Sequence, residues 1–457
     1  MWRSCSQNGA KTFPVTGTLR ARSGALSRAA IPKYARPVHG KTTAPPWRPA
    51  STLDEWVAKE ARPISLRQLM VFGRSLTEAR LLSSANYVRI ELPTRLAHRI
   101  RDMQTLPYVV VTNPHISLVY ELYYKAFETL RRVREIKTLE DNDRFCKKIS
   151  ETLQEHLTVI PRLAMGVLEC RDLMNPEDMD KFMNTILRSR ISRRVIAEQH
   201  LALTETFSSP WHFPDASSSL ETEFVGEVFL KCNAREVVQR CFSEVIALAS
   251  TTSPPNTQFP ELKLEGHLDA TFPYILSHLE YIIGELLRNS IQAIVEKQGK
   301  GGLKGKPPPI EVTVCEASQH VIIRVSDQGG GIPRDILPYL WAFSKGPRSH
   351  QRLENLHQVP KMAATLQEVR VTDLPKPHEI AQKEVAIHDS SLSTLSSRPP
   401  NLRLGMGLPL SRVYAEYWAG SLNMHSLEGF GVDAFLQISK LGNKNEQLTM
   451  RASMDAV

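Results

Sequence analysis

The spacing of apolar residues divides the chain into a helical half and a half in which strands and helices alternate. From about residue 60 to residue 206, apolar positions recur every three or four residues, as they do on the buried side of an amphipathic helix. The pattern predicts helices over 65–73, 75–98, 114–134, 142–170 and 177–206, with breaks at Pro93 and Pro161. A succession of long amphipathic helices predicts an up-and-down helical bundle.

The apolar period changes after about residue 222. Alternating apolar and polar residues predict strands over 223–230, 261–264, 310–315 and 321–326, and a closing hairpin over 421–426 and 432–438. Helical spacing returns over 233–249, 274–296 and 408–418. Strands that alternate with helices predict an α/β layer, so the expected fold class is α+β, with a helical bundle followed by an α/β sandwich.

The charge distribution separates a basic leader from a neutral body. Nine of the 57 Lys and Arg residues precede Asp54 and no acidic residue does, so 48 basic side chains remain to balance 48 Asp and Glu. The neutral body does not indicate a nucleic-acid-binding protein. A basic, acid-free leader is typical of a mitochondrial transit peptide, and a disordered basic tail is the alternative. The sequence contains no run of about 18 apolar residues, so it predicts no membrane span. The six cysteines form no C-x-x-C pair that would indicate a zinc site or a disulfide framework.

Composition sets the expected domain boundaries. We expect leader and linker over 1–53, a helical domain over 54–215, an α/β domain over 216–440 and a polar tail over 441–457. Residues 346–402 are rich in Pro, Ser and His and carry mixed charge, which predicts a flexible insertion. This insertion lies between two of the motifs described next, where a mobile lid over a bound ligand would lie.

The helix predicted over 274–296 has a divided surface. One stripe is apolar, and a second stripe carries Glu285, Asn289, Gln292 and Glu296 at spacings of four, three and four. The Glu285 carboxylate is suited to take a proton from an attacking hydroxyl group or water. The amide oxygen of Asn289, one turn later, is a ligand that suits Mg²⁺. A solvated helix face is the alternative interpretation of these polar residues.

Two glycine segments complete the pattern. Asp327 ends the strand over 321–326 and precedes three glycines, so its carboxylate can accept a hydrogen bond from the adenine amino group while the backbone turns beneath the base. Gly405-Met406-Gly407 leads into a helix whose first N–H groups can meet phosphates, and Lys345 could add positive charge there. Each feature has an alternative interpretation: Asp327 could belong to an ordinary Asp-Gly turn, Gly405-Met406-Gly407 could be a chance Gly-x-Gly, and Lys345 could be a solvated lysine. The three segments together, in this order, predict an ATP site. The chain has neither a G-x-x-x-x-G-K-[ST] loop nor the H-R-D and D-F-G motifs of eukaryotic protein kinases.

These segments resemble the N box and the two glycine boxes of the Bergerat ATP-binding fold, which gyrase, the Hsp90 chaperone, sensor histidine kinases and mitochondrial α-keto acid dehydrogenase kinases share. The segments that begin at Gly73, Glu91 and Asn113 resemble the helical domain of the dehydrogenase kinases. The resemblance to this family as a whole covers roughly residues 62–345 and 403–439. Pyruvate dehydrogenase kinases usually carry a histidine one turn before the base, where this chain has Tyr281. That position resembles the branched-chain member more closely, and pyruvate dehydrogenase kinase is the alternative.

The resemblance implies a matrix protein serine kinase that phosphorylates and inactivates the decarboxylase component of an α-keto acid dehydrogenase complex. It implies Glu285 as general base, Asn289 as the Mg²⁺ ligand and Asp327 as the adenine contact. The cofactors that it implies are ATP, Mg²⁺ and K⁺. It further implies docking on lipoyl domains of the acyltransferase core and a homodimer. The residues expected around the nucleotide are Arg288, Asn289, Gln292, Asp327, Gly329, Gly331, Ser344, Lys345, Gly405, Met406, Gly407 and Leu408.

Three other classes remain open at this stage. A sensor histidine kinase needs a phosphoacceptor histidine on a dimerising helix, and His98 and His200 are the nearest candidates, although neither is followed by the usual acidic residue. An ATP-driven clamp, such as a chaperone, places its ATP domain first, whereas this domain comes late in the chain. An ATP-binding scaffold without catalysis would only bind the complex.

Overall fold

The computed structural model describes residues 50–73, 76–208, 224–255, 257–299, 305–362 and 402–440. Most of the predicted leader, the C-terminal tail and the part of the insertion from 363 to 401 therefore lie outside the described residues. Within the described ranges, no helix combines the length and the hydropathy that crossing a bilayer would require.

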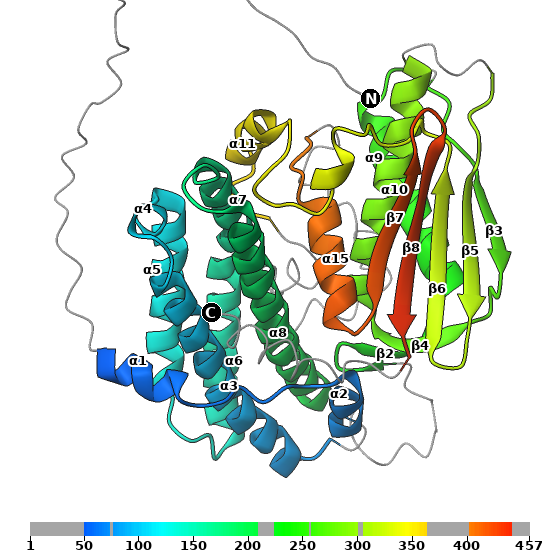
Figure 1. Cartoon of the computed structure of the whole chain (residues 1–457). Helices are drawn as coiled ribbons and strands as arrows, with labels where there is room; N and C mark the ends of the chain where they lie inside the picture. The colour runs from blue at the N-terminus through cyan, green and yellow to red at the C-terminus, as the bar shows by residue number, and fades with distance from the viewer. Residues whose placement is uncertain are drawn as a thin grey trace, which may run out of the picture. The chain divides into compact units, whose positions relative to one another are not determined.

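The first part of the described chain consists of helices (Figure 1). They are α1 (Ala50–Val57), α2 (Leu66–Gly73), α3 (Glu78–Gln104), α4 (Tyr108–Val111), α5 (Pro114–Arg131), α6 (Leu139–Glu155), the 3₁₀ turn η1 (His156–Thr158), α7 (Val159–Glu169) and α8 (Pro176–Ser208). Helix α3 packs against α5 and α8, and α5 packs against α7. The side chains of Thr77, Asn113 and Thr138 accept N–H groups at the starts of α3, α5 and α6, because the first turn of a helix leaves its amides unpaired. The predicted helical bundle is confirmed.

The two prolines behave differently from each other. Helix α3 continues through Pro93, so the break predicted there is wrong. Proline removes one backbone hydrogen bond, but the surrounding turn is buried from Glu91 to Ala97, and this packing holds the helix together. The break predicted near Pro161 is confirmed, because α6 gives way to a 3₁₀ turn and Pro161 lies in the first turn of α7, where its missing N–H is tolerated.

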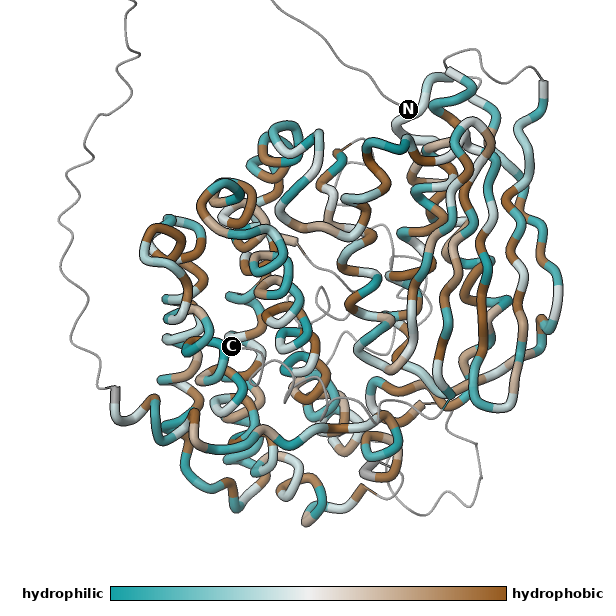
Figure 2. Tube along the Cα trace, viewed as in Figure 1, coloured by the Kyte–Doolittle hydropathy of each residue, from teal (hydrophilic) through white to brown (hydrophobic). Residues whose placement is uncertain are grey.

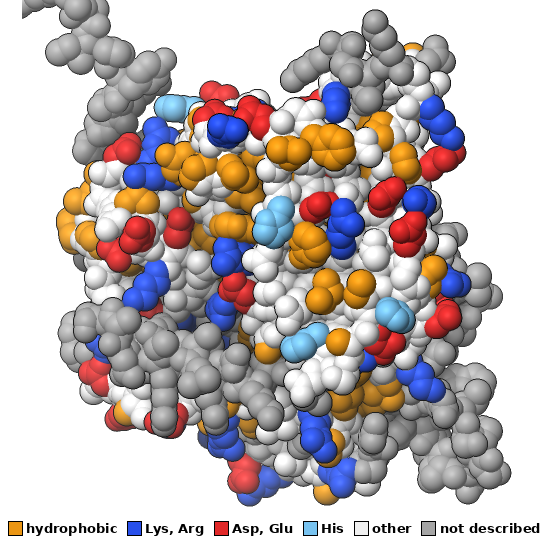
Figure 3. Space-filling view, turned by 45° about the vertical axis from the view of Figure 1, so that its right-hand side comes forward, with side chains coloured by type: hydrophobic (Ala, Val, Ile, Leu, Met, Phe, Trp, Pro, Cys, Tyr) orange, Lys and Arg blue, Asp and Glu red, His pale blue; other side chains and the backbone are white. Residues whose placement is uncertain are grey.

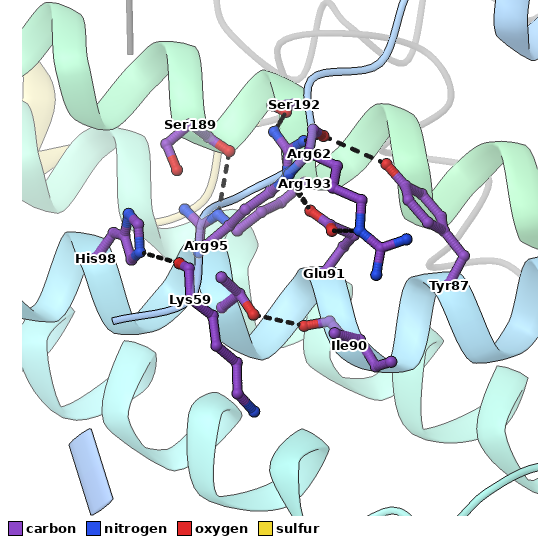
Figure 4. Close-up of polar contacts among 11 residues, drawn as sticks. Lys59, Arg62, Tyr87, Ile90, Glu91, Arg95, His98, Ser189, Ser192 and Arg193 are labelled. Carbon is purple, nitrogen blue, oxygen red and sulfur yellow. Dashed lines mark hydrogen bonds and ion pairs between the residues drawn. The ribbon is translucent and has the colours of Figure 1, made fainter. Parts of the chain in front are cut away.

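A buried polar network joins three segments of the helical part (Figure 4). Glu91 of α3 accepts the backbone N–H of Arg62 at 3.1 Å and the Nε–H of Arg95 at 3.3 Å. The same Arg95 donates to the Ser192 hydroxyl on α8 and to the Arg62 carbonyl. Burial raises the pKa of Glu91, and the two arginines oppose this shift. The network therefore fixes the segment between α1 and α2 against α3 and α8.

The second part is a two-layer α/β structure (Figure 1). Five strands form a sheet in the order β3 (Leu262–Gly266), β5 (Ile310–Glu316), β6 (His320–Asp327), β8 (Gly431–Ser439) and β7 (Ser421–Leu427), and only the β3–β5 pair is parallel. A smaller sheet has the order β1 (Phe224–Val225), β2 (Val228–Asn233) and β4 (Thr271–Ile275). Helices α9 (Ala234–Thr252), α10 (Leu276–Gly299) and α15 (Gly407–Tyr417) lie along one face of the large sheet. The predicted α+β class is confirmed.

The phase of the strands decides which residues reach the helix layer. Apolar and polar positions alternate along the large sheet (Figure 2), and in β6 every second residue is buried, from Val321 to Asp327. Asp327 is therefore in phase with the core residues of its strand and faces α10, because side chains two apart share one face of a strand. Val325, two residues earlier, pairs with Val312 of β5 and with Ala434 of β8 on the same buried face.

The surface of this sheet carries both signs of charge. On the face shown in Figure 3, Lys and Arg are intermingled with Asp and Glu. Arg324 pairs with Asp433 at 2.9 Å, and Lys263 on the edge strand β3 pairs with Glu265 at 2.8 Å. Exposed pairs of this kind contribute little to stability, because water and salt screen them. This face agrees with the neutral body that the sequence indicates.

Helix α8 contacts the α/β part along much of its length. Its Gln199 accepts the Glu227 amide at 2.8 Å and donates to the Val225 carbonyl at 3.2 Å, and Arg188 forms an ion pair with Glu416 of α15. Asp180, in the second turn of α8, accepts hydrogen bonds from the segment that follows the 3₁₀ turn η3 (Leu337–Tyr339). The helical part is thus joined to the α/β part by specific polar contacts.

Candidate nucleotide site

The three motifs meet at one cavity. It has a volume of about 540 Å³, within the range of ligand pockets in proteins. Its walls come from α10, from the end of β6 with the following glycines, and from the segment that enters α15. The lining includes Glu285, Arg288, Asn289, Gln292, Asp327, Gly329, Gly331, Lys345, Gly405, Gly407 and Leu408. The structure therefore brings together most of the residues that the sequence selected, although they are far apart along the chain.

Glu285 lies where α10 meets the second glycine segment. Its side chain is buried, and Oε1 lies 3.1 Å from Nη1 of Arg288, one turn later on the same helix. A Cβ atom at Gly407 would lie 2.0 Å from Oε2 of Glu285. Only a glycine at 407 therefore leaves the carboxylate in this place, next to the first turn of α15.

Asn289 extends from α10 into the open part of the cavity. Its side chain is exposed, and it lies one turn after Glu285 on the helix. An amide oxygen in an accessible position fits a metal that keeps most of its coordination for water and phosphate, as Mg²⁺ does. Gln292 and Glu296 continue the same wall of the cavity.

Asp327 lines the cavity and is held by two hydrogen bonds. Oδ2 accepts the Ser290 hydroxyl at 2.8 Å, and Oδ1 accepts the Gly329 amide at 2.9 Å. Burial raises the pKa of Asp327, while the bonds from Gly329 and Ser290 oppose the rise. A carboxylate has about four acceptor positions, so two protein bonds leave capacity for an exocyclic amine.

Ser290 was missed by the sequence interpretation, and a signal for it was present. Residues 283, 287, 290 and 294 lie on one stripe of α10, and the other three are fully buried isoleucine or leucine. A serine in such a stripe is a buried hydroxyl that needs a partner. Its partner is the Asp327 carboxylate.

Basic residues gather in the cavity wall around the segment that enters α15. Lys345, which the sequence interpretation selected, is exposed and lines the wall. The wall also contains three arginines that the sequence interpretation did not select: Arg348, Arg352 and Arg403. Arg403 forms an ion pair with Glu296 of α10. Helix α15 begins at Gly407 in the same wall, so its first N–H groups and its positive dipole end face this side. This part of the wall suits an anionic group.

Two of the selected residues are not in the cavity wall. Ser344 is fully buried and its hydroxyl donates to Asp180 at 3.2 Å, and Met406 is fully buried in the core. The expected direct contact of these two side chains with the nucleotide is therefore not supported. Both residues lie in segments that border the cavity, and their neighbours Lys345 and Gly405 line it.

The two histidines considered as phosphoacceptors have structural surroundings. His200 is completely buried between Ser84 and Asn142, and burial lowers its pKa to about 4. His98 contacts the Lys59 carbonyl at 2.9 Å through Nε2. A ring enclosed like that of His200 cannot meet a phosphate donor, and this weighs against the sensor-kinase alternative.

Comparison with known proteins gives consistent matches in both parts of the chain. Residues 63–229 match the family model described as mitochondrial branched-chain alpha-ketoacid dehydrogenase kinase. Residues 275–440 match the one described as histidine kinase-, DNA gyrase B- and HSP90-like ATPase. The first match contains the helical part and the second contains the cavity.

Similar full-length proteins were also found. Pyruvate dehydrogenase (acetyl-transferring) kinase 2, mitochondrial, of Saccharomyces cerevisiae is 31% identical, with 87% of this chain and 86% of the relative covered. The pyruvate dehydrogenase (acetyl-transferring) kinase, mitochondrial, of Arabidopsis thaliana is 30% identical, with 86% and 94% covered. Isozyme 4 of Rattus norvegicus is 26% identical, with 84% and 82% covered. The chain therefore belongs to the mitochondrial α-keto acid dehydrogenase kinase family and is an ATP-dependent mitochondrial protein kinase.

Proposed function

We propose that this kinase phosphorylates a serine of the decarboxylase component of the pyruvate dehydrogenase complex and thereby inactivates it. The observation that carries the proposal is the similarity over most of the chain to kinases named for pyruvate dehydrogenase. It is supported by a cavity in which a carboxylate, an amide and basic groups converge.

The branched-chain complex, favoured in the sequence interpretation, is not supported by these relatives, since the similar proteins at 26–31% identity are named for pyruvate dehydrogenase. The preference depended mainly on Tyr281. This side chain is buried on α10 and lies against Tyr414 of α15, with ring centroids 5.3 Å apart. A residue that packs two helices together carries little information about which protein substrate docks outside.

The arrangement suits direct transfer of a phosphoryl group. The serine oxygen of the substrate would form a bond to the γ-phosphorus of ATP while the bond from that phosphorus to the β–γ bridging oxygen breaks, and ADP leaves. Glu285 would accept the proton of the serine hydroxyl. Asp327 would hold the adenine amino group, and Lys345 with the first amides of α15 would hold the phosphates. Catalysis would then depend on positioning and charge stabilisation.

Magnesium fits the residues that are present. Asn289 would hold it, since its amide is accessible in the cavity wall one turn after Glu285. When bound, Mg²⁺ neutralises charge that develops on the β- and γ-phosphates. A potassium requirement stays a prediction of the family resemblance.

Partners and assembly belong to the same proposal. We place the kinase in the mitochondrial matrix, docked through its helical domain on lipoyl domains of the acyltransferase core, as a homodimer. The domain limits 54–215 and 216–440 stay a prediction, and their common boundary lies outside the described residues.

Incubation with both complexes tests the proposal. Full-length protein, Mg-ATP and either the pyruvate or the branched-chain complex are mixed, and phosphoserine formation and residual decarboxylase activity are followed together. We expect faster phosphorylation and loss of activity in the pyruvate complex. Faster modification of the branched-chain complex would overturn the substrate assignment, and no transfer to either would overturn the kinase proposal.

Substitution of the base tests the chemistry. Glu285→Gln is expected to lower kcat by about 10² to 10⁴, the usual contribution of a general base, while calorimetry still detects ATP binding. Glu140→Gln, at an exposed position of α6, is the matched control and should keep wild-type turnover. Unchanged turnover in Glu285→Gln would refute the assignment.

A further inference from the structure

The insertion predicted as a flexible lid begins with a packed helix. Helix α11 (Ser349–His357) lies within residues 346–402 and packs against α7. Leu356 on its inner side is fully buried in the main hydrophobic core, and the Met362 amide donates to the Leu157 carbonyl at 3.1 Å. The described beginning of the insertion is therefore an integral part of the fold, which corrects the expectation of a wholly flexible segment.

One buried arginine on α11 contacts both segments at the phosphate end of the cavity. Arg352 is about nine-tenths buried. Its Nη2 donates to the carbonyl of Phe343 at 3.0 Å and of Gly405 at 3.2 Å, and its Nε donates to the carbonyl of Leu404 at 3.3 Å. Nη1 lies 3.4 Å from the Lys345 carbonyl. A single guanidinium thus bonds to four carbonyls, two in the segment 343–345 and two in the segment 404–405.

The backbone around Arg352 is shaped for it. Gly405 has a φ of +66°, a conformation that favours glycine, and a Cβ there would lie 2.2 Å from Nε of Arg352. Gly405 therefore allows both the turn and the close approach of the guanidinium. Lysine could not replace these bonds, because its ammonium is a single point without the planar fork.

Asp180 of α8 holds the first of these segments from the other side. Its Oδ1 accepts the Phe343 amide at 2.9 Å, the Ser344 amide at 3.1 Å and the Ser344 hydroxyl at 3.2 Å. The charge of Asp180 also opposes the effect of burial, which lowers the pKa of Arg352. Segment 343–345 is thereby fixed between an acid from the helical part and a base from α11.

We propose that Asp180 and Arg352 are positioning residues that together fix the segments 343–345 and 404–405 at the spacing that the β- and γ-phosphates require. We call this pair the Asp180–Arg352 clamp. It acts through Lys345 and the entry to α15, because the guanidinium itself is bonded to backbone carbonyls. The inference rests on the nucleotide site and its orientation proposed above, with adenine at Asp327.

Binding of two nucleotides separates positioning of the phosphates from a general loss of structure. ATP and AMP share the adenosine and the first phosphate, but only ATP reaches the second and third phosphate positions. We expect Arg352→Met to raise the Kd for ATP about ten-fold or more, as loss of several hydrogen bonds to a charged group would, and to change the Kd for AMP by less than about two-fold. The KM for ATP should rise in parallel, and Arg352→Lys should recover only a small part of the ATP affinity.

Two further variants make the test decisive. Lys361→Met removes an exposed basic residue shortly after α11 and should bind both nucleotides like the wild type. Asp180→Ala perturbs the clamp from the helical part and should show the same selective loss of ATP affinity, so it decides the matter if Arg352→Met does not fold. Unchanged ATP binding in the folded variants, or equal weakening of ATP and AMP, would overturn the proposal.

Calorimetry requires no dehydrogenase complex, so the clamp and the protein substrate are tested separately. A wild-type protein that binds ATP but phosphorylates neither complex would contradict the proposed function and leave the clamp result valid. A kinase with unchanged ATP affinity in both clamp variants would contradict only the clamp.

Discussion

Replacement of Gly407 by alanine would place a methyl group almost on the Glu285 carboxylate. The added Cβ would lie 2.0 Å from Oε2, whereas real Cβ atoms essentially never approach another heavy atom closer than 3.0 Å. The carboxylate would have to retreat by about 1 Å, and a displacement of that size at a reacting group can lower the rate by about 10². Retreat is restricted because the side chain is buried and paired with Arg288 at 3.1 Å.

The expected result is a selective loss of turnover. For Gly407→Ala we expect kcat to fall about 100-fold, while the Kd for ATP changes less, because the hydrogen bonds that hold Asp327 come from Ser290 and Gly329 and are kept. Steady-state phosphorylation of the decarboxylase component gives kcat, and calorimetry gives the Kd. A kcat close to that of the wild type would refute the placement of the base against the second glycine segment.

Gly284 provides a matched control on α10. It directly precedes Glu285 in sequence, and a Cβ there would meet nothing within 4 Å. Gly284→Ala should leave kcat unchanged and raise the free energy of unfolding by up to about 1 kcal/mol, the difference in helix propensity between the two residues. Denaturant unfolding measures that change, and a loss of stability would show that the space around Gly284 is not open.

Three further expectations concern Asp327 and the metal. Ser290→Ala removes the hydroxyl that donates to Asp327 at 2.8 Å. We expect the free energy of unfolding to fall by about 1–3 kcal/mol and ATP binding to weaken. Denaturant titration and calorimetry measure the two effects, and unchanged values would show that the bond contributes nothing. Burial raises the pKa of Asp327 above 3.8, so ATP affinity should begin to decline, as pH falls, at a higher pH than for an ordinary aspartate. The contribution of Asp327 to the free energy of unfolding has the opposite sign: it is fully present below pH 3.8 and is lost as pH rises through the raised pKa. Measurements of the Kd for ATP and of unfolding over a pH series check both signs, and pH-independent ATP binding in acid would contradict the adenine assignment. Chelation of Mg²⁺ should abolish phosphoryl transfer reversibly, and Asn289→Ala should raise the Mg²⁺ concentration needed for half-maximal rate; an unchanged requirement would remove Asn289 as its ligand.

The sequence predicted those elements whose apolar period was long and regular. The stripe of Ile283, Leu287 and Ile291 identified α10, and alternation identified the β5–β6 pair with Asp327 in phase with the core. These patterns suffice because burial of one face directly determines the period of a helix or strand. They also selected most of the cavity wall, because the period that places apolar side chains in the core also determines which polar side chains lie together on one face.

The misses have local physical reasons. Residues 274 and 275 were assigned to the long helix, but they end β4, an edge strand that tolerates Pro273 because one side of an edge strand has no partner strand. A short apolar run that joins a helix does not by itself distinguish strand from helix. Arg352 could not be found, because its role depends on carbonyl groups from two distant segments, and a sequence pattern carries no information about where backbone carbonyls point.

Helix α8 gives the two parts of the chain a common mechanical element. Asp180, Arg188 and Gln199 lie within about a 100° arc of the helix and span about 28 Å along its axis, and each bonds to a different segment of the nucleotide-binding part. A fragment that starts after residue 208 would leave the Ser344 hydroxyl and two backbone amides without their acceptor. Such an isolated catalytic domain should therefore be a weaker nucleotide binder than the intact protein, and engineering of this kinase has to preserve α8 as a whole.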